Sequence, residues 1–293
     1  MVEIRWTRRP DDLRAPALVF AFGGWNDAAE AASTALSVVG RSFAARRLAE
    51  VDPDELFDFQ AVRPTIDLSE PGDGVLTWPE VALREARAPG APRDLVLLGG
   101  PEPSSRWRGF CELLLDAAQG LGVELVVGLG ALLADVPHTR RATLTGIASP
   151  SSLVEGMAFR APSYQGPTGI VGVLHATAAA RGLAAVSLWA PVPHYLAGAT
   201  NPAGALALVR GLERVTGVAV KAGALEDAVS EWERQVSAAV ERDPAAQELV
   251  ERLEHAYDER GEPDLDPGPL PSGDVLAGEL ERFLRQRDGD PEP

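Results

Sequence analysis

The chain has 293 residues, enough for one large domain or one domain with an appendage, and its hydrophobic content of 45% is ordinary for a globular protein. Its formal net charge of −16 argues against partners that need Lys and Arg, namely nucleic acid and anionic membrane surfaces. The single cysteine, Cys111, excludes an intramolecular disulfide and a cysteine-based zinc site, which fits a reducing cytoplasm.

The first clear elements lie in residues 17–39. A run of six apolar residues predicts a strand buried on both faces, two glycines permit a sharp turn, and an Ala-rich helix follows. This is the first half of a βαβ unit, and in an open α/β sheet such strand ends carry the sites. Trp25, Asn26 and Asp27 are therefore the first candidate residues. Alternatively, Asp27 only caps the helix and Trp25 fills a gap.

The regions flanking this unit show weaker patterns. The start of the chain has no signal-peptide pattern, and we expect residues 1–16 to be irregular. Residues 43–51 could form a second strand. Many turn residues follow, and we expect short strands near 61–62, 75–77 and 81–86, the last two joined by a hairpin turn at Trp78-Pro79.

Three further apolar runs predict buried strands, at residues 94–98, 123–129 and 184–190. Each is followed by Gly, Pro or polar residues at the position where sites gather. The remaining predicted elements are a helix from Ser104 or Ser105 to about Gly120, a short strand at 143–147, a helical turn at 150–155, a helix at 170–181 and a helix from Asn201 or Pro202 to about Val215.

From Ala222 onwards the chain becomes acidic. Residues 222–293 contain 20 acidic and 7 basic residues, whereas residues 1–221 contain 23 and 20. We therefore expect an α/β core domain at 1–221 and an acidic helical extension at 222–293. Apolar stripes predict helices at 225–240, 249–257 and 272–287, with an extended or disordered segment at 261–271. These stripes could dock on a second subunit or fold back on the core.

Side chains with catalytic potential are few. His138 and His194 each follow a proline beyond a strand, and with Asp27 they could perform acid–base chemistry at one sheet edge. Alternatively, each histidine holds a loop by a hydrogen bond. His175 and His255 are interpreted as packing or surface residues.

Common cofactor and catalytic motifs are absent from the sequence. There is no metal-ligand spacing, no serine-hydrolase elbow and no glycine motif for a nucleotide phosphate or a dinucleotide. We therefore expect no metal, no cofactor and no catalysis. Aromatic residues beside turns could instead anchor a partner or cover the sheet ends; they are Trp25, Trp78, Tyr164 and Tyr195.

Several short strings, in order, resemble the bacterial, actinobacterial-type members of the proteasome assembly chaperone 2 family. They are Gly24-Trp25-Asn26-Asp27, Gly100-Pro101-Glu102-Pro103 with Arg106-Trp107, Asp135-Val136-Pro137-His138-Thr139-Arg140, Tyr164-Gln165-Gly166-Pro167-Thr168-Gly169, Leu188-Trp189-Ala190-Pro191-Val192-Pro193-His194-Tyr195 and the terminal Pro271-Ser272-Gly273-Asp274. The residues expected to form a partner surface or pocket are Trp25, Asn26, Asp27, Arg106, Trp107, Pro137, His138, Tyr164, Gly166, Pro167, His194 and Tyr195.

The resemblance implies a three-layer α/β/α sandwich of phosphorylase/hydrolase-like type with a helical C-terminal addition. It implies a homo-oligomer, with a trimer expected, and proteasome subunits as partners. Archaeal relatives engage the proteasome with a C-terminal hydrophobic–Tyr–any-residue tail, whereas this chain ends Pro291-Glu292-Pro293, so docking by such a tail is not expected. The leading hypothesis is a cytoplasmic, non-enzymatic, chaperone-like interaction protein. The alternative is a small-molecule hydrolase or phosphorylase-like enzyme that uses Asp27 with His138 or His194.

Overall fold

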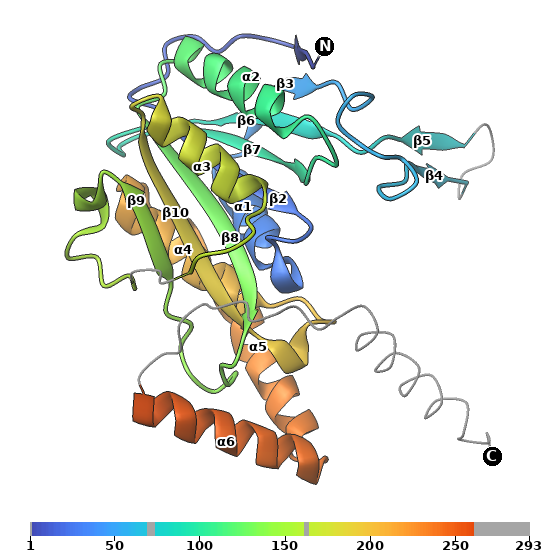
Figure 1. Ribbon diagram of the computed structural model, residues 1–293, viewed down its shortest axis with the longest axis vertical. Coiled ribbons are helices and arrows are strands. Elements are labelled where there is room, and N and C mark those ends of the chain that lie inside the picture. Colours follow the sequence, from blue (N-terminus) through green and yellow to red (C-terminus); the bar gives the residue numbers. More distant parts are fainter. Residues whose placement is uncertain (1, 69–73, 161–163, 261–293) are drawn as a thin grey trace.

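A mixed eight-stranded sheet forms the centre of the computed structural model, which describes residues 2–68, 74–160 and 164–260 (Figure 1). The strand order is β1-β3-β6-β7-β2-β8-β10-β9. The four central strands β7, β2, β8 and β10 are parallel, and the outer strands pair antiparallel. The strands are β1 (Ile4–Trp6), β2 (Ala17–Gly23), β3 (Arg46–Val51), β6 (Val81–Ala86), β7 (Leu95–Pro101), β8 (Leu125–Ala134), β9 (Thr145–Ser149) and β10 (Ala184–Pro193).

Two pairs of helices cover the sheet, one pair on each face, which confirms the predicted three-layer α/β/α architecture (Figure 1). Helices α1 (Ala31–Ser42) and α4 (Pro202–Thr216) pack on one face, and α2 (Trp107–Gly120) and α3 (Ile170–Ala180) pack on the other. Short 3-10 helices are η1 (Ala28–Glu30), η2 (Ser151–Val154) and η3 (His194–Leu196).

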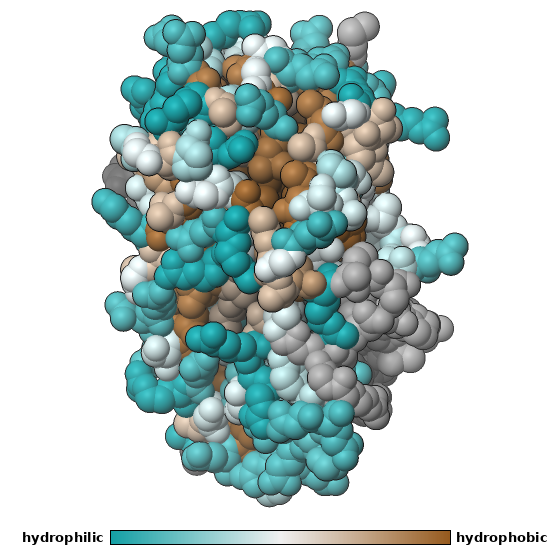
Figure 2. All heavy atoms as spheres, turned by 90° about the vertical axis from the view of Figure 1, so that its left-hand side faces the viewer, coloured by the Kyte–Doolittle hydropathy of each residue, from teal (hydrophilic) through white to brown (hydrophobic). Residues whose placement is uncertain are grey.

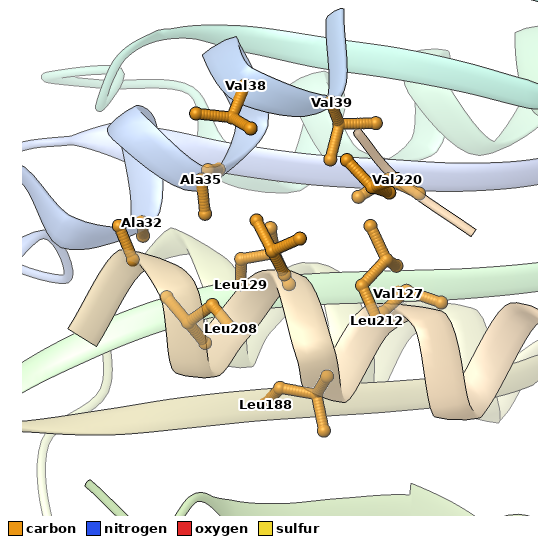
Figure 3. Packing of buried hydrophobic residues seen from close by; sticks show 14 of the residues in the cluster. Ala32, Ala35, Val38, Val39, Val127, Leu129, Leu188, Leu208, Leu212 and Val220 are labelled. Atoms are coloured by element: carbon orange, nitrogen blue, oxygen red, sulfur yellow. The ribbon is translucent and has the colours of Figure 1, made fainter. Parts of the chain in front are cut away.

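The central strands are buried on both faces because successive side chains point to opposite sides of the sheet. In β2, Val19 faces the α1–α4 side, whereas Phe20 faces the α2–α3 side, and both are fully buried. Figure 3 shows the first of these layers, where α1 packs across α4 through small and branched apolar side chains such as Ala35 and Leu208. This two-sided burial explains why these strands read as continuous apolar runs.

Three predictions of local structure are wrong. Residues 1–16 contain strand β1, which pairs with β3, and residues 61–62 lie in a turn. The predicted hairpin at Trp78-Pro79 does not form, because β5 (Val75–Thr77) pairs with β4 (Thr65–Asp67), whereas β6 pairs with β3 and β7. The apolar residues of β6 are buried inside the large sheet, while β4 and β5 are exposed along their whole length.

Two acidic helices follow the core, and we call them the C-terminal arm: α5 (Gly223–Val240) and α6 (Pro244–Arg260). They extend beyond the carboxyl ends of the central strands (Figure 1). The predicted break at Asp243-Pro244 separates them, as expected. The segment 261–271 and the helix predicted at 272–287 lie outside the described residues.

Candidate functional site

The carboxyl ends of the four parallel strands bring the distant motifs to one rim of the sheet. Residues 24–27 follow β2, residues 102–103 follow β7, residues 135–140 follow β8, and residues 194–195 follow β10. Helix α3 begins after the 164–169 loop at the same rim, since it returns antiparallel to β10. The predicted clustering of the motifs at the strand ends therefore has its basis in the parallel pairing.

Asp27 holds the start of α1. Its Oδ1 accepts hydrogen bonds from the backbone amides of Ala32 at 2.7 Å and Ser33 at 3.1 Å, and its side chain is buried. Burial raises the pKa of this carboxyl, while the bonds to Ser33 and Ala32 act in the opposite direction. Asp27 thus supplies acceptors for helix amides that have no partner within the helix.

Asn26 and Glu102 together hold the start of α3. Asn26 Oδ1 accepts from the Val171 amide at 3.4 Å, and Glu102 Oε1 accepts from the Ile170 amide at 2.8 Å. Gly169 leaves room for this arrangement, because a Cβ there would lie 2.1 Å from Asn26 Oδ1. Residues from the ends of β2 and β7 therefore fix where α3 begins.

The 164–169 loop is held by its own tyrosine. Tyr164 Oη donates a hydrogen bond to the Pro167 carbonyl at 2.7 Å. Gly166 lies under the ring, and a Cβ there would approach the Tyr164 hydroxyl to 2.4 Å. The spacing of Tyr, Gly and Pro in this motif is therefore explained by the local geometry of the loop.

A cavity of about 140 Å³ lies beside this loop, between α3 and strands β8, β9 and β10. Its walls combine apolar and aromatic side chains with a few polar groups. The lining residues used below are Trp25, Asn26, Tyr164, His175, Ser187 and Trp189. We call this space the α3 cavity. It brings together four of the predicted site residues, namely Trp25, Asn26, Tyr164 and Pro167.

The second cluster at the rim attaches the C-terminal arm. The Tyr195 hydroxyl lies 2.8 Å from both the backbone nitrogen and Nδ1 of His138, and His138 Nε2 lies 3.2 Å from Ser237 Oγ on α5. Burial lowers the pKa of His138, and it raises the pKa of Tyr195. A neutral imidazole that accepts at Nδ1 and donates at Nε2 satisfies both contacts.

The residues after His138 bind α6 through charge. Arg140 pairs with Glu254 at 3.1 Å and with Asp258 at 2.7 Å, and Thr139 donates a hydrogen bond to Glu254. The hydroxyl of Tyr257 donates to the Arg141 carbonyl at 3.0 Å. The acidic residues of α6 thus face a basic loop of the core.

Of the other predicted site residues, Arg106 and Trp107 lie apart from these two clusters, whereas Pro137 and His194 flank the second one. Arg106 pairs with Glu55 at 3.5 Å, and Trp107 Nε1 donates to the Pro103 carbonyl at the start of α2. His194 Nδ1 lies 3.1 Å from an exposed Asp135 carboxylate. Pro137 is buried immediately before His138.

The three groups of the catalytic alternative are engaged separately. Among the described residues, no hydrogen bond or ion pair joins Asp27 to His138 or His194. Both ring nitrogens of His138 already have partners. The catalytic alternative therefore stays a prediction for which the hydrogen bonds give no support.

Several cavity residues were missing from the sequence prediction. His175 is buried, with its Nδ1 2.9 Å from Ser187 Oγ. The available signal was a polar residue, Ser187, inside an otherwise apolar strand, since a buried hydroxyl needs a partner. Trp189 lies two residues further along the strand and therefore on the same face of β10.

These observations define the class of protein: a three-layer α/β/α domain whose strand-end motifs cap helices, line a small cavity and attach a helical arm. The model of the PAC2 family matches residues 21–240. The chain belongs to the PAC2 family.

Solved structures agree with this assignment. A PAC2 family protein from Streptomyces avermitilis is 44% identical with a TM-score of 0.74, covering 80% of this chain and 99% of that one. A proteasome-assembly chaperone homologue from Mycobacterium tuberculosis is 39% identical, with the same TM-score and the same two coverages. An archaeal proteasome activator from Pyrococcus furiosus shares the fold at 16% identity and a TM-score of 0.64, covering 81% and 98%.

Three further findings are negative. No match was found among curated proteins. In the described parts of the chain, no helix has the length and apolar character to cross a bilayer. Within those same parts, no group of three or more His, Cys, Asp or Glu residues is placed to hold a metal ion.

Proposed function

We propose that this chain acts by protein–protein contact as a cytoplasmic, proteasome-assembly-chaperone-like protein that self-associates and catalyses no reaction. Membership of the PAC2 family supports the proposal, as does a 39% identical relative described as a proteasome-assembly chaperone homologue. Two of the residues considered as catalytic candidates have structural contacts instead: Asp27 caps α1, and His138 contacts the C-terminal arm. The proposal therefore places function on surfaces.

The observation that carries the proposal is an exposed apolar hairpin, formed by β4, β5 and their flanking residues. It projects from the body of the molecule on the side away from β9 (Figure 1). Its large apolar side chains are 47–69% exposed: Ile66, Leu68, Val75, Leu76 and Trp78. Contiguous apolar surface of this kind marks interaction sites.

A second copy of the chain is the proposed partner of this hairpin. A two-stranded hairpin is marginally stable alone in water, so burial against a partner would stabilise it. On the opposite side, the face that carries the edge strand β9 shows apolar side chains gathered in a hollow (Figure 2). Contact between surfaces on opposite sides is head-to-tail, and such contacts form a ring when the rotation between neighbouring copies closes, and an open filament when it does not. A cyclic trimer is the proposed form.

Proteasome subunits are the proposed client. The test mixes the purified chain with proteasome α and β subunits from the same genome and follows the rate at which assembled particles form. We expect faster assembly with the wild type and loss of this effect with the double variant Ile66→Ser/Leu76→Ser. Leu133→Ser is the control, because Leu133 is 43% exposed outside the hairpin. An unchanged assembly rate with the wild type would contradict the proposed role.

A further inference from the structure

Two residues that line the α3 cavity each carry a buried donor with no acceptor among the described residues. The donors are Nδ2 of Asn26 and Nε1 of Trp189. Asn26 is 2% exposed and Trp189 is 8% exposed, so bulk solvent does not supply the missing acceptors. Buried donors are almost always paired, and an unpaired one carries a substantial free-energy cost. Two such donors on residues that line one cavity point to an occupant that accepts hydrogen bonds.

Other contacts hold both donor side chains in place. Asn26 uses Oδ1 at the start of α3, and its backbone carbonyl accepts from the Ala131 amide at 2.8 Å. The Trp189 ring lies against Gly130, where a Cβ would be 2.4 Å from the ring. A donor set fixed in this way loses little conformational entropy when an acceptor binds.

The cavity is uncharged. Among the described residues that line it, none is Lys, Arg, Asp or Glu. Its one titratable imidazole, His175, is bonded to Ser187 at 2.9 Å, and burial lowers the pKa of His175, which keeps the ring neutral at pH 7. An ionised ligand would therefore be desolvated here without a counter-charge. A neutral ligand is favoured.

We propose that the α3 cavity binds a small neutral one-ring molecule that carries a carbonyl-type oxygen, which accepts hydrogen bonds from Asn26 and Trp189. The volume of about 140 Å³ suits one ring, since an apolar protein cavity of about 150 Å³ holds benzene. Leu132, Ile147 and Pro167 supply apolar contacts. Trp25 and Tyr164 are 39% and 38% exposed, so this part of the wall reaches solvent and offers an entrance. The proposal is independent of the partners named above.

Three one-ring probes separate the contributions to binding. Benzamide has the ring and a neutral acceptor, toluene has the ring without an acceptor, and benzoate has a charged acceptor. Titration calorimetry on the full chain is expected to show benzamide binding roughly tenfold more tightly than toluene, the effect of one or two neutral hydrogen bonds. Benzoate is expected to bind more weakly than benzamide. Equal affinities for benzamide and toluene, or no binding of benzamide, would overturn the proposal.

Trp189→Phe removes one donor and keeps an aromatic ring. Its affinity for benzamide is expected to fall several-fold, while its affinity for toluene stays within twofold. Trp107→Phe is the matched control, because the Trp107 indole donates to the Pro103 carbonyl outside the cavity. Unchanged benzamide affinity in Trp189→Phe would contradict the assigned donor.

A measurement on the unmodified protein covers the case in which Trp189→Phe fails to fold. The chain has six tryptophans, each of which gives one indole N–H resonance in a nitrogen-15 correlation spectrum. Benzamide is expected to shift the Trp189 resonance downfield and to leave that of Trp107 in place. If all six indole resonances stay fixed at saturating benzamide, the donors serve an ordered water or no ligand, and the proposal is wrong.

Discussion

Asp27 offers the sharpest test of how the strand-end motif stabilises the fold. Replacing it by Ala removes the acceptor of the Ala32 and Ser33 amides, which lie at 2.7 and 3.1 Å from Oδ1. Loss of a cap costs about 1 kcal/mol, and a buried amide left without a partner costs about 1–3 kcal/mol. The Ala32 amide is buried, so we expect Asp27→Ala to lower the free energy of unfolding by about 2–3 kcal/mol.

Asp27→Asn separates the role of the acceptor from that of the charge. Asn keeps an oxygen for the two amides but cannot ionise. Because burial raises the pKa of Asp27 in the folded protein, the folded state binds more protons than the unfolded state above the unfolded pKa. The wild type should therefore lose stability relative to Asp27→Asn as pH rises from about 4 through the folded pKa.

Urea unfolding of the three proteins between pH 4 and pH 8 measures both effects. We expect Asp27→Asn to match the wild type to within about 1 kcal/mol at pH 7, and Asp27→Ala to fall well below both. The reasoning would be refuted if Asn were as destabilising as Ala. It would also be refuted if the wild type gained stability relative to Asn with rising pH, since the helix amides would then outweigh burial.

Three further predictions concern the other contacts at the rim. Gly169→Ala should destabilise the protein by about 1–3 kcal/mol in urea unfolding, because the added Cβ would lie 2.1 Å from Asn26 Oδ1 at the start of α3. The control is Gly109→Ala on α2, which should be neutral or stabilising because no atom lies within 4 Å of its Cβ. A larger loss of stability in Gly109→Ala than in Gly169→Ala would contradict this. Burial lowers the pKa of His138, so the wild type should lose stability as pH falls below about 6.5. His138→Gln should lose less stability over the same pH range. Equal pH dependence of the two proteins would show that His138 contributes nothing to it. Arg140→Ala should speed proteolysis of α6, because it removes the ion pairs with Glu254 and Asp258. Arg141→Ala is the control and should not, because Arg141 contacts α6 through its backbone carbonyl. Equal cleavage rates in the two variants would disprove the Arg140 attachment.

The central strands could be predicted from sequence because burial on both faces leaves an unbroken apolar run. Strand β10 extends further than predicted, through Pro191 and Pro193. A proline cannot donate to a ladder, but β9 pairs only with residues 185–189 of β10, so both prolines lie where no bond to β9 is needed. The sequence prediction ended this strand at residue 190, before the first proline. It was too short because the neighbouring strand β9 is short and, among the described residues, leaves the end of β10 without a partner on that side.

The sequence predicted β5 at residues 75–77 but missed its partner β4, and it missed the cavity for a different reason. Strand β4 has three exposed residues, so no burial pattern marks it. The cavity depends on which residues meet across α3, β8, β9 and β10, and the contact between His175 and Ser187 depends on the register of a helix against a strand. Motif strings, by contrast, singled out Asn26, Asp27 and His138, and these residues lie at the rim. Their predicted role as a partner surface or pocket remains a prediction.

The central claim is that the β4–β5 hairpin joins copies of this chain, and sedimentation equilibrium measures it most directly. The chain has a mass of 31.0 kDa. We predict a mass of about three times that value for the wild type and a single-chain mass for Ile66→Ser/Leu76→Ser, with Leu133→Ser behaving as the wild type. A single-chain mass for the wild type at micromolar concentration, or an unchanged oligomer in the hairpin variant, would contradict the account.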